Sequence, residues 1–397
     1  MIQQIAFVIV LGTAIYFIRK RILFIRNTIN LGRDKPIKDR PGDRFRNMLL
    51  VAFGQKKMFK RPFPAILHFF IYAGFLIINL EVLEFVIDGL VGTHRIFAPY
   101  LGGFYNIAMN FFEFLAVAVL LSCVIMLLRR NVAKVKRFWS AEMTSWPRLD
   151  ANIILFTEII LMFAILTMNA SDQLLQQRSV EHYTPTGSLW FSSALTSTLG
   201  TFNTSTLILI ERSAWWFHIL GILAFAAYIT YSKHLHIFLA FPNTYFANVE
   251  PKGHMENMPV VTNEVKLMLG LAEASAAPPA APGRFGAKDV NDLSWNNLLA
   301  AYSCTECGRC TSECPANLTG KKLSPRKIMM DTRDRMEEVG KSLANNGSGL
   351  NDGKTLLGNY ITKEEINACT SCNACVEACP VRNMWPRIFR KITRFRS

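Results

Sequence analysis

Five apolar stretches dominate the first 240 residues of this 397-residue chain. They run approximately over residues 2–18, 65–87, 107–128, 151–169 and 214–235. Each is about as long as an α-helix must be to cross the hydrocarbon core of a bilayer. A backbone surrounded by lipid has to satisfy its own hydrogen bonds, so such stretches can only form helices. The sequence therefore predicts a five-helix transmembrane domain over residues 1–240.

The basic residues predict the orientation of this bundle. Lys and Arg number 14 in residues 19–64, one in 88–106, six in 129–150, two in 170–213 and 21 after residue 232. Loops rich in Lys and Arg stay in the cytoplasm, so the N-terminus is expected outside and the C-terminal part in the cytoplasm. Arg19–Arg21 follows the first stretch instead of preceding it, which favours a retained helix over a cleaved signal. The net charge of +15 is thereby explained without nucleic acid as a partner.

Eight of the nine cysteines lie in two strings near the C-terminus. "CTECGRCTSECP" begins at Cys304 and "CTSCNACVEACP" at Cys369, and each reads C-x2-C-x2-C-x3-C-P. This is the spacing of bacterial ferredoxins with two [4Fe-4S] clusters, in which the fourth cysteine of each string binds the other cluster. The predicted ligand sets are Cys304, Cys307, Cys310 and Cys379 for one cluster, and Cys369, Cys372, Cys375 and Cys314 for the second.

A pair of structural zinc sites is the alternative interpretation of the cysteines. Zinc sites use separate C-x2–4-C pairs and do not need a third cysteine at the next third position. Disulfides are disfavoured on the reducing cytoplasmic side of a membrane. The spacing therefore favours iron–sulfur clusters.

The cysteine strings belong to a predicted ferredoxin domain of residues 290–397. A connector over 241–289 precedes it and contains the Pro/Ala-rich segment "AEASAAPPAAPGRFGA". "LSWNNLLAAYS" has apolar residues at helical spacing, Ser324-Pro325 predicts a helix N-terminus, and Thr362 with Glu365 forms a capping box. The predicted fold class is all-α: a five-helix transmembrane bundle followed by a cytoplasmic α-helical ferredoxin domain.

Four histidines in or beside the apolar stretches are candidate cofactor ligands: His68, His218, His234 and His236. A histidine inside a membrane helix is costly and normally faces a partner in the bundle. His218 and His236 are about five turns apart, so one continuous helix would place them on one face near opposite membrane surfaces. His68 and His236 are expected at one level, where two histidines can bind a b-type haem. Alternatively, His234 and His236 are polar residues at the headgroup level, and the other two make interhelical hydrogen bonds.

These motifs resemble known families. "WWFHILGILAFAAYITYSKHLHIFLAFPN" (residues 215–243) and the five-span layout resemble the haem b membrane subunit of respiratory nitrate reductase, gamma type. The ferredoxin domain resembles that of succinate dehydrogenase iron–sulfur subunits. Over nearly its full length the chain resembles the membrane-bound iron–sulfur oxidoreductases related to heterodisulfide reductase. This resemblance implies a multi-pass protein of the bacterial cytoplasmic (inner) membrane, in contact with membrane lipid.

The resemblance also implies roles for the histidines. His68 and His236 would bind a haem b on the cytoplasmic side, and His218 an outer haem, which gives one haem or two. The gamma-type pattern has another histidine about ten residues after the first one in the second span, where this chain has Ile78 and Asn79. His218 could therefore bind no cofactor, pair with His94 from an outer loop, or contact a quinone.

The function implied by the resemblance is electron transfer between the quinone pool and a cytoplasmic redox partner, through haem b and two [4Fe-4S] clusters. The partner would be a separate CCG-type iron–sulfur subunit, an electron-transfer flavoprotein or a dehydrogenase, because the short basic C-terminus lacks the CCG domain of many relatives.

The sequence does not identify catalytic residues. Membrane carboxylates are candidates for proton exchange with a quinone or plain interfacial groups: Glu81, Glu84, Glu113, Glu158 and Asp172. The competing hypothesis is a structural or redox-sensing subunit of a larger membrane complex.

Overall fold

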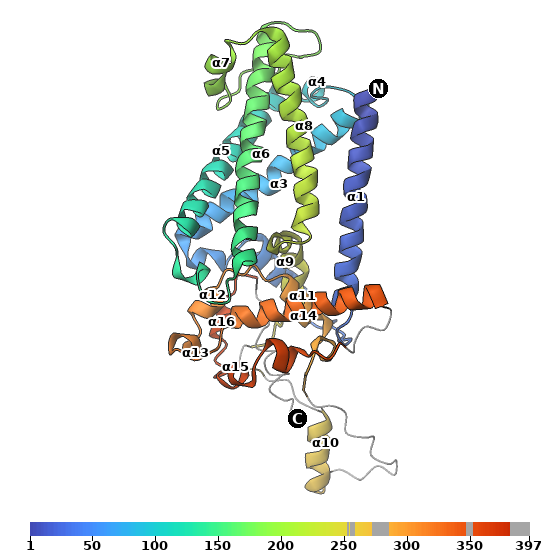
Figure 1. Cartoon of the computed structure of the whole chain (residues 1–397), viewed down its shortest axis with the longest axis vertical. Coiled ribbons are helices and arrows are strands. Elements are labelled where there is room, and N and C mark those ends of the chain that lie inside the picture. The colour runs from blue at the N-terminus through green and yellow to red at the C-terminus, as the bar shows by residue number, and fades with distance from the viewer. Residues whose placement is uncertain (252–253, 255–258, 272–285, 347–351, 382–397) are drawn as a thin grey trace. The chain divides into compact units, whose positions relative to one another are not determined.

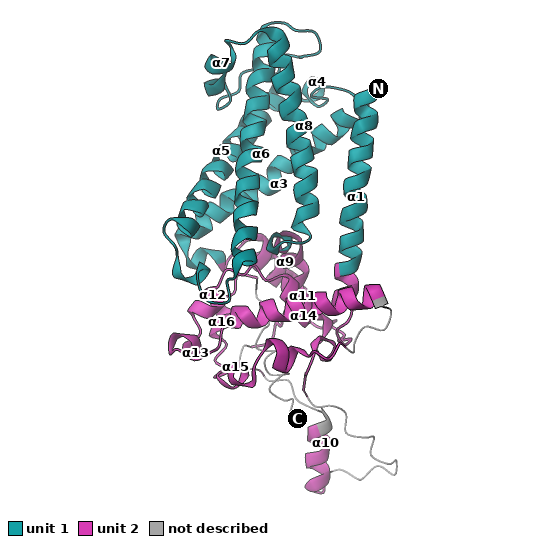
Figure 2. Ribbon diagram, viewed as in Figure 1, with its two compact units in different colours: residues 1–24, 58–235 teal, residues 25–57, 236–397 magenta. Residues whose placement is uncertain are grey.

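The computed structural model describes residues 1–251, 254, 259–271, 286–346 and 352–381. Within these residues the chain is helical, and its β-type pairing consists of two isolated bridges. The predicted all-α class is therefore confirmed. The chain divides into two compact units, coloured separately in Figure 2: unit 1 holds residues 1–24 and 58–235, and unit 2 holds residues 25–57 and 236–397.

Unit 1 is a bundle of long helices (Figure 1). The long helices are α1 (Ile2–Ile29, whose last residues belong to unit 2), α3 (Pro62–Val91), α5 (Gly103–Asn131), α6 (Ser145–Gln177) and α8 (Thr204–Ile229). Short elements join them: η2 (Met58–Lys60), α4 (Ala98–Leu101), η3 (Lys136–Phe138), α7 (Ser193–Leu199) and η4 (Lys233–Leu235). Helix α6 packs against α5 and α8, and α3 packs against α5.

Four of these helices, α3, α5, α6 and α8, are long and apolar enough to cross a membrane. Helix α1 covers the first expected span but is not among these four, so the count of five spans is not confirmed. Phe7 of α1 is buried in the apolar core of the bundle, where its ring centroid lies 5.9 Å from that of Trp215. Burial of large aromatic side chains is a main source of helix-packing energy, so α1 is an integral part of this unit.

The fifth apolar stretch is not one continuous helix. Helix α8 ends at Ile229, η4 follows, and α9 (His236–Tyr245) begins at His236 in unit 2. The prediction that His218 and His236 share one face of a single helix is therefore wrong. The apolar composition of the stretch predicted a span but carried no signal for this interruption.

Asp150 of α6 explains where α8 stops. Its buried carboxylate accepts hydrogen bonds from Tyr228 Oη at 2.5 Å, from Ser232 Oγ at 2.6 Å and from the backbone N–H of Lys233 at 3.1 Å. A carboxylate that binds side chains and a backbone N–H at a helix terminus stabilises the non-helical turn against continuation of the helix. The interruption is thus caused by a residue about 80 positions away in the sequence.

Unit 2 contains the ferredoxin-like part and more. Its elements are α2 (Pro41–Met48), η1 (Leu49–Phe53), α9, α10 (Pro259–Met268), η5 (Val290–Asp292), α11 (Trp295–Tyr302), α12 (Arg309–Ser312), α13 (Pro315–Leu318), α14 (Pro325–Asn346), η6 (Leu356–Tyr360), α15 (Lys363–Asn367) and α16 (Ala374–Ala378). The helix predicted over "LSWNNLLAAYS", the helix start at Pro325 and the capping box of Thr362 with Glu365 are confirmed. Residues 272–285 of the predicted linker lie outside the described residues.

Residues 25–57 and α9 belong to unit 2, whereas the sequence placed them in the membrane domain. Arg44 of α2 is buried, and its Nη1 donates to the carbonyl of Ala247 at 2.8 Å, just after α9. Asn47 donates to the carbonyl of Thr244 at 2.5 Å. The ferredoxin domain therefore includes an N-terminal segment as a structural component.

At Gly32 and Arg33 the backbone of this N-terminal segment runs close to that of residues 293–295. Arg33 N–H donates to Leu293 O at 2.7 Å and Trp295 N–H donates to Arg33 O at 3.2 Å, which pairs the two backbones. A Cβ on Gly32 would lie 2.6 Å from the backbone nitrogen of Trp295 and 2.8 Å from its Cα.

We expect Gly32→Ala to destabilise unit 2 by about 1–3 kcal/mol, because the added methyl meets backbone that cannot turn aside. Thermal unfolding of the purified chain, followed by the visible absorbance of its clusters, measures this loss. Gly42→Ala is the matched control, since nothing lies within 4 Å of a Cβ at Gly42. Equal unfolding temperatures for the two variants would contradict the prediction.

Candidate metal centres

The two cysteine strings fold into loops with the same backbone conformation. Left-handed residues stand at two matching positions: Glu306 (φ 54°) and Gly308 (φ 71°) in the first string, Ser371 (φ 56°) and Asn373 (φ 62°) in the second. Glycine and asparagine adopt this conformation readily, whereas Glu306 and Ser371 do so at some cost in energy. A short helix follows each loop, α12 or α16, and these two helices pack against each other.

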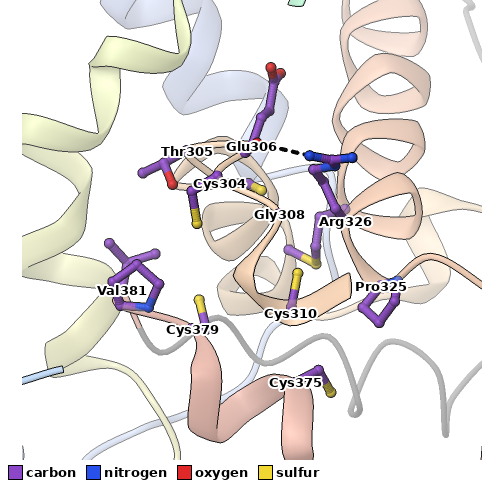
Figure 3. A pocket seen from close by; sticks show the side chains of 13 residues that line it. Cys304, Thr305, Glu306, Gly308, Cys310, Pro325, Arg326, Cys375, Cys379 and Val381 are labelled. Carbon is purple, nitrogen blue, oxygen red and sulfur yellow. Dashed lines mark hydrogen bonds between the residues drawn. The ribbon is translucent and has the colours of Figure 1, made fainter. Parts of the chain in front are cut away.

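The first string forms a cavity with an empty volume of about 390 Å³. Its lining includes Cys304, Cys307 and Cys310, and also Cys379 from the end of α16. Figure 3 shows the sulfurs of Cys304, Cys310 and Cys379 pointing into the same space. The predicted fourth cysteine from the other string is thus brought to this cavity.

The second string forms a similar cavity with an empty volume of about 290 Å³. Its lining includes Cys369, Cys372 and Cys375, together with Cys314 from the first string. Cys314 immediately precedes α13, whose first residue is Pro315, and Cys375 lines both cavities. Each cavity is thus lined by cysteines of one string and by the fourth cysteine of the other, with Cys375 shared, and the two ligand sets stay a prediction. Within the described residues, no three His, Cys, Asp or Glu side chains are placed to hold a single metal ion.

The thiols of the first cavity are in an environment that disfavours their ionised form. Burial raises the pKa of Cys304 to about 12, and burial together with Cys307 raises the pKa of Cys310 well above its ordinary value. Thiolates, not thiols, bind metals, so deprotonation here at neutral pH requires cationic metal close to the sulfurs. The donor set therefore fits a [4Fe-4S] cluster, whose irons would supply that charge. In the second string the N–H of Ser371 lies 3.3 Å from Cys369 Sγ, the type of hydrogen bond that tunes cluster potentials.

Two arginines of α14, the buried Arg326 and the half-buried Arg333, hold the first loop in place. Arg326 lines the cavity, and its Nη1 lies 3.4 Å from the carbonyl oxygen of Glu306 (Figure 3). Arg333 forms an ion pair of 2.6 Å with the Glu306 carboxylate. Both contacts support the left-handed conformation of Glu306. Sequence reasoning missed these arginines, although basic residues on the predicted helix beside the first string were a usable signal.

Segments distant in the sequence hold the second string. Lys57 Nζ donates to the carbonyl of Val376 at 2.8 Å, and Asn243 Nδ2 donates to the carbonyl of Val381 at 2.8 Å. The Arg309 guanidinium lies 3.4 Å from the carbonyl of Lys57, next to the first string. These contacts fix the backbone around the cysteines, and no sequence pattern indicated them.

The hydrogen bonding of His218 leaves one ring nitrogen available to bind a metal. It is 1% exposed, its Nδ1 lies 3.0 Å from the carbonyl of Leu161, and its buried Nε2 has no hydrogen-bond partner. A proton on Nδ1, donated to that carbonyl, leaves a free lone pair on Nε2, as in many metal-bound histidines. His94 Nε2 lies 3.4 Å from Asp172 Oδ1, and its pairing with His218 at an outer haem stays a prediction.

The remaining candidate histidines lie in different parts of the chain. His68 is on α3 in unit 1, and His236 is the first residue of α9 in unit 2. His234 is in η4, where its backbone N–H donates to Ser232 Oγ at 3.0 Å and its ring centroid lies 5.6 Å from that of Phe225. Haem ligation by these three histidines stays a prediction.

Comparison with known proteins gives the class of this chain. Residues 303–384 match the family model of the 4Fe-4S dicluster domain. This match covers both cysteine strings. Residues 303–384 are thus similar to dicluster iron–sulfur domains.

Three curated relatives extend the similarity. The chain is 27% identical over 398 residues (93% of its length) to the "Probable iron-sulfur-binding oxidoreductase FadF" of Bacillus subtilis. It is 24% identical over 371 residues (86%) to the "EtfAB:quinone oxidoreductase" of Syntrophomonas wolfei. Over 112 residues (24%) it is 33% identical to a "Probable membrane-anchored ferredoxin" of Chromohalobacter salexigens, of which it covers 16%.

The chain spans about half the length of the first two relatives, 51% and 47%. No solved structure matches. Over most of its own length the chain is therefore similar to proteins named as iron–sulfur oxidoreductases.

Proposed function

We propose that this protein transfers electrons between a membrane quinone and a cytoplasmic redox partner, with two [4Fe-4S] clusters and haem b as its redox groups. One observation carries this proposal: Cys379 of the second string lines the cavity of the first string, and Cys314 of the first string lines the cavity of the second. The cysteines that line the two cavities would hold the clusters, which would supply one-electron transfer. The two helices that follow the cysteine loops, α12 and α16, pack against each other.

Four apolar helices and a buried histidine support the membrane half of the proposal. We assign His68 and His236 to a haem on the cytoplasmic side, as the family resemblance implies, with His234 as a neighbouring polar residue. The free Nε2 of His218 can bind a second haem or accept a hydrogen bond from a quinol hydroxyl. The number of haems per chain tests the ligand role: two haems would support His218 as a ligand, and one haem would leave the quinol contact or no cofactor.

An electron-transfer flavoprotein is the partner that the comparisons favour. One relative is named EtfAB:quinone oxidoreductase, and this chain is similar to it over 86% of its own length. We therefore propose that the cluster domain exchanges electrons with a flavoprotein of this kind. A CCG-type subunit and a dehydrogenase remain the other expected partners.

Cofactor content and quinol-driven reduction test the proposed function. Anaerobically purified protein should contain about eight non-haem irons and eight sulfides per chain, and its pyridine haemochrome should show haem b. In membranes, a reduced quinone analogue should reduce the clusters, observed by electron paramagnetic resonance.

Two results would contradict the proposal. A colourless or zinc-loaded preparation would exclude the redox role of the cysteines. Intact clusters that neither a quinol nor a reduced flavoprotein can reduce would favour a structural or redox-sensing subunit instead.

A further inference from the structure

Unit 1 contains a buried polar cluster around Arg95, which follows α3. The Arg95 guanidinium lies 2.5 Å from Asp172 Oδ2, 2.9 Å from Asn169 Oδ1 and 3.2 Å from Tyr105 Oη. Its backbone N–H donates to Asp88 Oδ2 at 2.8 Å. All five residues are buried. Charged groups in membrane helices are costly, so a cluster of this size calls for an explanation.

Two more buried carboxylates of this cluster hold loops against the helices. Glu84 accepts hydrogen bonds from Phe97 N–H at 2.9 Å and from Tyr105 Oη at 2.7 Å. Glu113 accepts hydrogen bonds from the N–H groups of Phe191 and Ser192 at 3.0 and 3.2 Å. Such donors stabilise an ionised carboxylate, and loop anchoring accounts for these residues.

Glu81, nearly one turn before Glu84 on α3, is different. It is 2% exposed, and its buried Oε1 has no hydrogen-bond partner. Its charged neighbours are Arg95, Glu84 and Glu113, two of which carry the same sign as an ionised Glu81. A buried carboxylate without donors is strongly destabilised in its charged form, whereas the protonated form is tolerated.

The charge balance of the cluster supports a bound proton. The buried carboxylates around the Arg95 guanidinium are Glu81, Glu84, Asp88, Glu113 and Asp172. His94 lies beside Asp172, and Arg212, which also acts on Asp172, is already paired with Glu211, so the described carboxylates still outnumber the cations. Full ionisation would leave several negative charges without a cation in a buried site. At least one carboxyl must therefore hold a proton, and Glu81 has the fewest contacts that could stabilise its anion.

A line of polar side chains leads from this region to the surface of unit 1. Glu113 accepts a hydrogen bond from Asn169 at 3.2 Å, and Asn169 in turn contacts Arg95, the ion-pair partner of Asp172. Asp172 Oδ1 lies 3.4 Å from His94 Nε2. The His94 ring centroid is 5.4 Å from that of His182, which is exposed. Polar side chains thus extend from Glu113, a charged neighbour of Glu81, toward the exposed His182, and among them Asp172 and the two histidines can exchange a proton.

We propose that Glu81 is a proton-exchange site inside the membrane unit and that the polar line ending at His182 connects it with water. This inference rests on the proposed quinone function. Oxidation of a quinol releases two protons and two electrons (QH2 → Q + 2 H⁺ + 2 e⁻), and the electrons leave through the redox groups. Glu81 first loses its proton toward the surface, and its carboxylate then takes a proton from the quinol; this cycle runs twice for each quinol, once with each electron, so both protons leave by the same route. When a quinone is reduced, protonated Glu81 is the donor and the same steps run in reverse.

Infrared difference spectroscopy on the purified full-length chain tests the protonation of Glu81. The wild-type minus Glu81→Gln spectrum at neutral pH should contain the C=O stretch of a buried carboxylic acid. Glu81→Asp should retain such a band at a shifted position, and Glu84→Gln, the control on the same helix face, should not remove it. The Glu81→Gln chain should unfold at the wild-type temperature, because an amide replaces a neutral carboxyl of the same shape. Absence of the band from the difference spectrum would overturn the proposal.

Reduction kinetics test the role of this proton. We expect Glu81→Gln to slow reduction of the clusters by a quinol about 100-fold, the usual effect of losing a general acid or base. Reduction by dithionite should be unchanged. A wild-type quinol rate in the variant would also overturn the proposal. If quinol reduces neither protein, the proposed quinone function fails, while the infrared result still decides whether Glu81 holds a proton.

Discussion

Replacing Cys379 with alanine is expected to remove the cluster of the other cysteine string. Cys379 belongs to the second string in sequence, but its sulfur lines the cavity of Cys304, Cys307 and Cys310. Non-haem iron should fall from about eight to about four per chain. Cys314→Ala should have the reciprocal effect on the cavity of the second string. Iron and sulfide assays with electron paramagnetic resonance measure both losses.

Double substitutions identify the cluster that each cysteine serves. Cys379→Ala with Cys307→Ala removes two ligands of one cluster, so about four irons should remain. Cys379→Ala with Cys372→Ala removes ligands of both clusters, so the iron content should fall close to zero. The reverse pattern would show that each string holds its own cluster. Cys123→Ala is the control, because this cysteine is buried in the apolar core of unit 1 and belongs to neither string.

Arg335→Met is expected to cause the largest loss of stability in unit 2. The Arg335 side chain is 0% exposed and forms ion pairs with Asp289 at 2.7 Å and with Asp352 at 2.5 Å. Its Nη2 also donates to the carbonyl of Lys354 at 2.7 Å. Removal of one partner from a buried ion pair leaves an uncompensated charge and costs about 3–5 kcal/mol.

The measurement is the temperature at which cluster absorbance is lost. For a unit of this size, the predicted loss corresponds to a decrease of roughly 6–20 °C in Tm. Lys322→Ala is the matched control, because its ion pair with Glu364 is exposed (73% and 64%) and contributes little. A Tm for Arg335→Met within the error of the Lys322→Ala value would show that the buried pair does not hold the unit together.

Local patterns predicted much of the fold and of the candidate site. The helix start at Pro325 and the capping box at Thr362 depend on residues within one turn, so they could be predicted from short stretches of sequence. The same is true of the long apolar helices, since their length and composition suffice. The grouping of the cysteines followed from the ferredoxin spacing, and the two cavities have the lining that it predicts.

Long-range contacts were beyond sequence reasoning. Asp150 ends α8 from another helix, and Lys57 supports Val376 across 319 positions. The sequence did not distinguish Glu81 from the other carboxylates of the apolar stretches. Only the folded bundle shows which of these carboxylates accept hydrogen bonds. The assignment of residues 25–57 to unit 2 depends in part on the close backbone approach at Gly32.

The sequence by itself determined the helical class, the apolar helices and the paired cysteine strings, because each depends on residue spacing along a short segment. The tertiary structure alone decided where the fifth apolar stretch breaks, which segments enclose the cysteines, and which buried carboxyl lacks a partner. These properties depend on hydrogen bonds and packing between residues far apart in the chain. Their energies are set by burial and by the geometry of donors and acceptors, and neither quantity exists before the chain has folded.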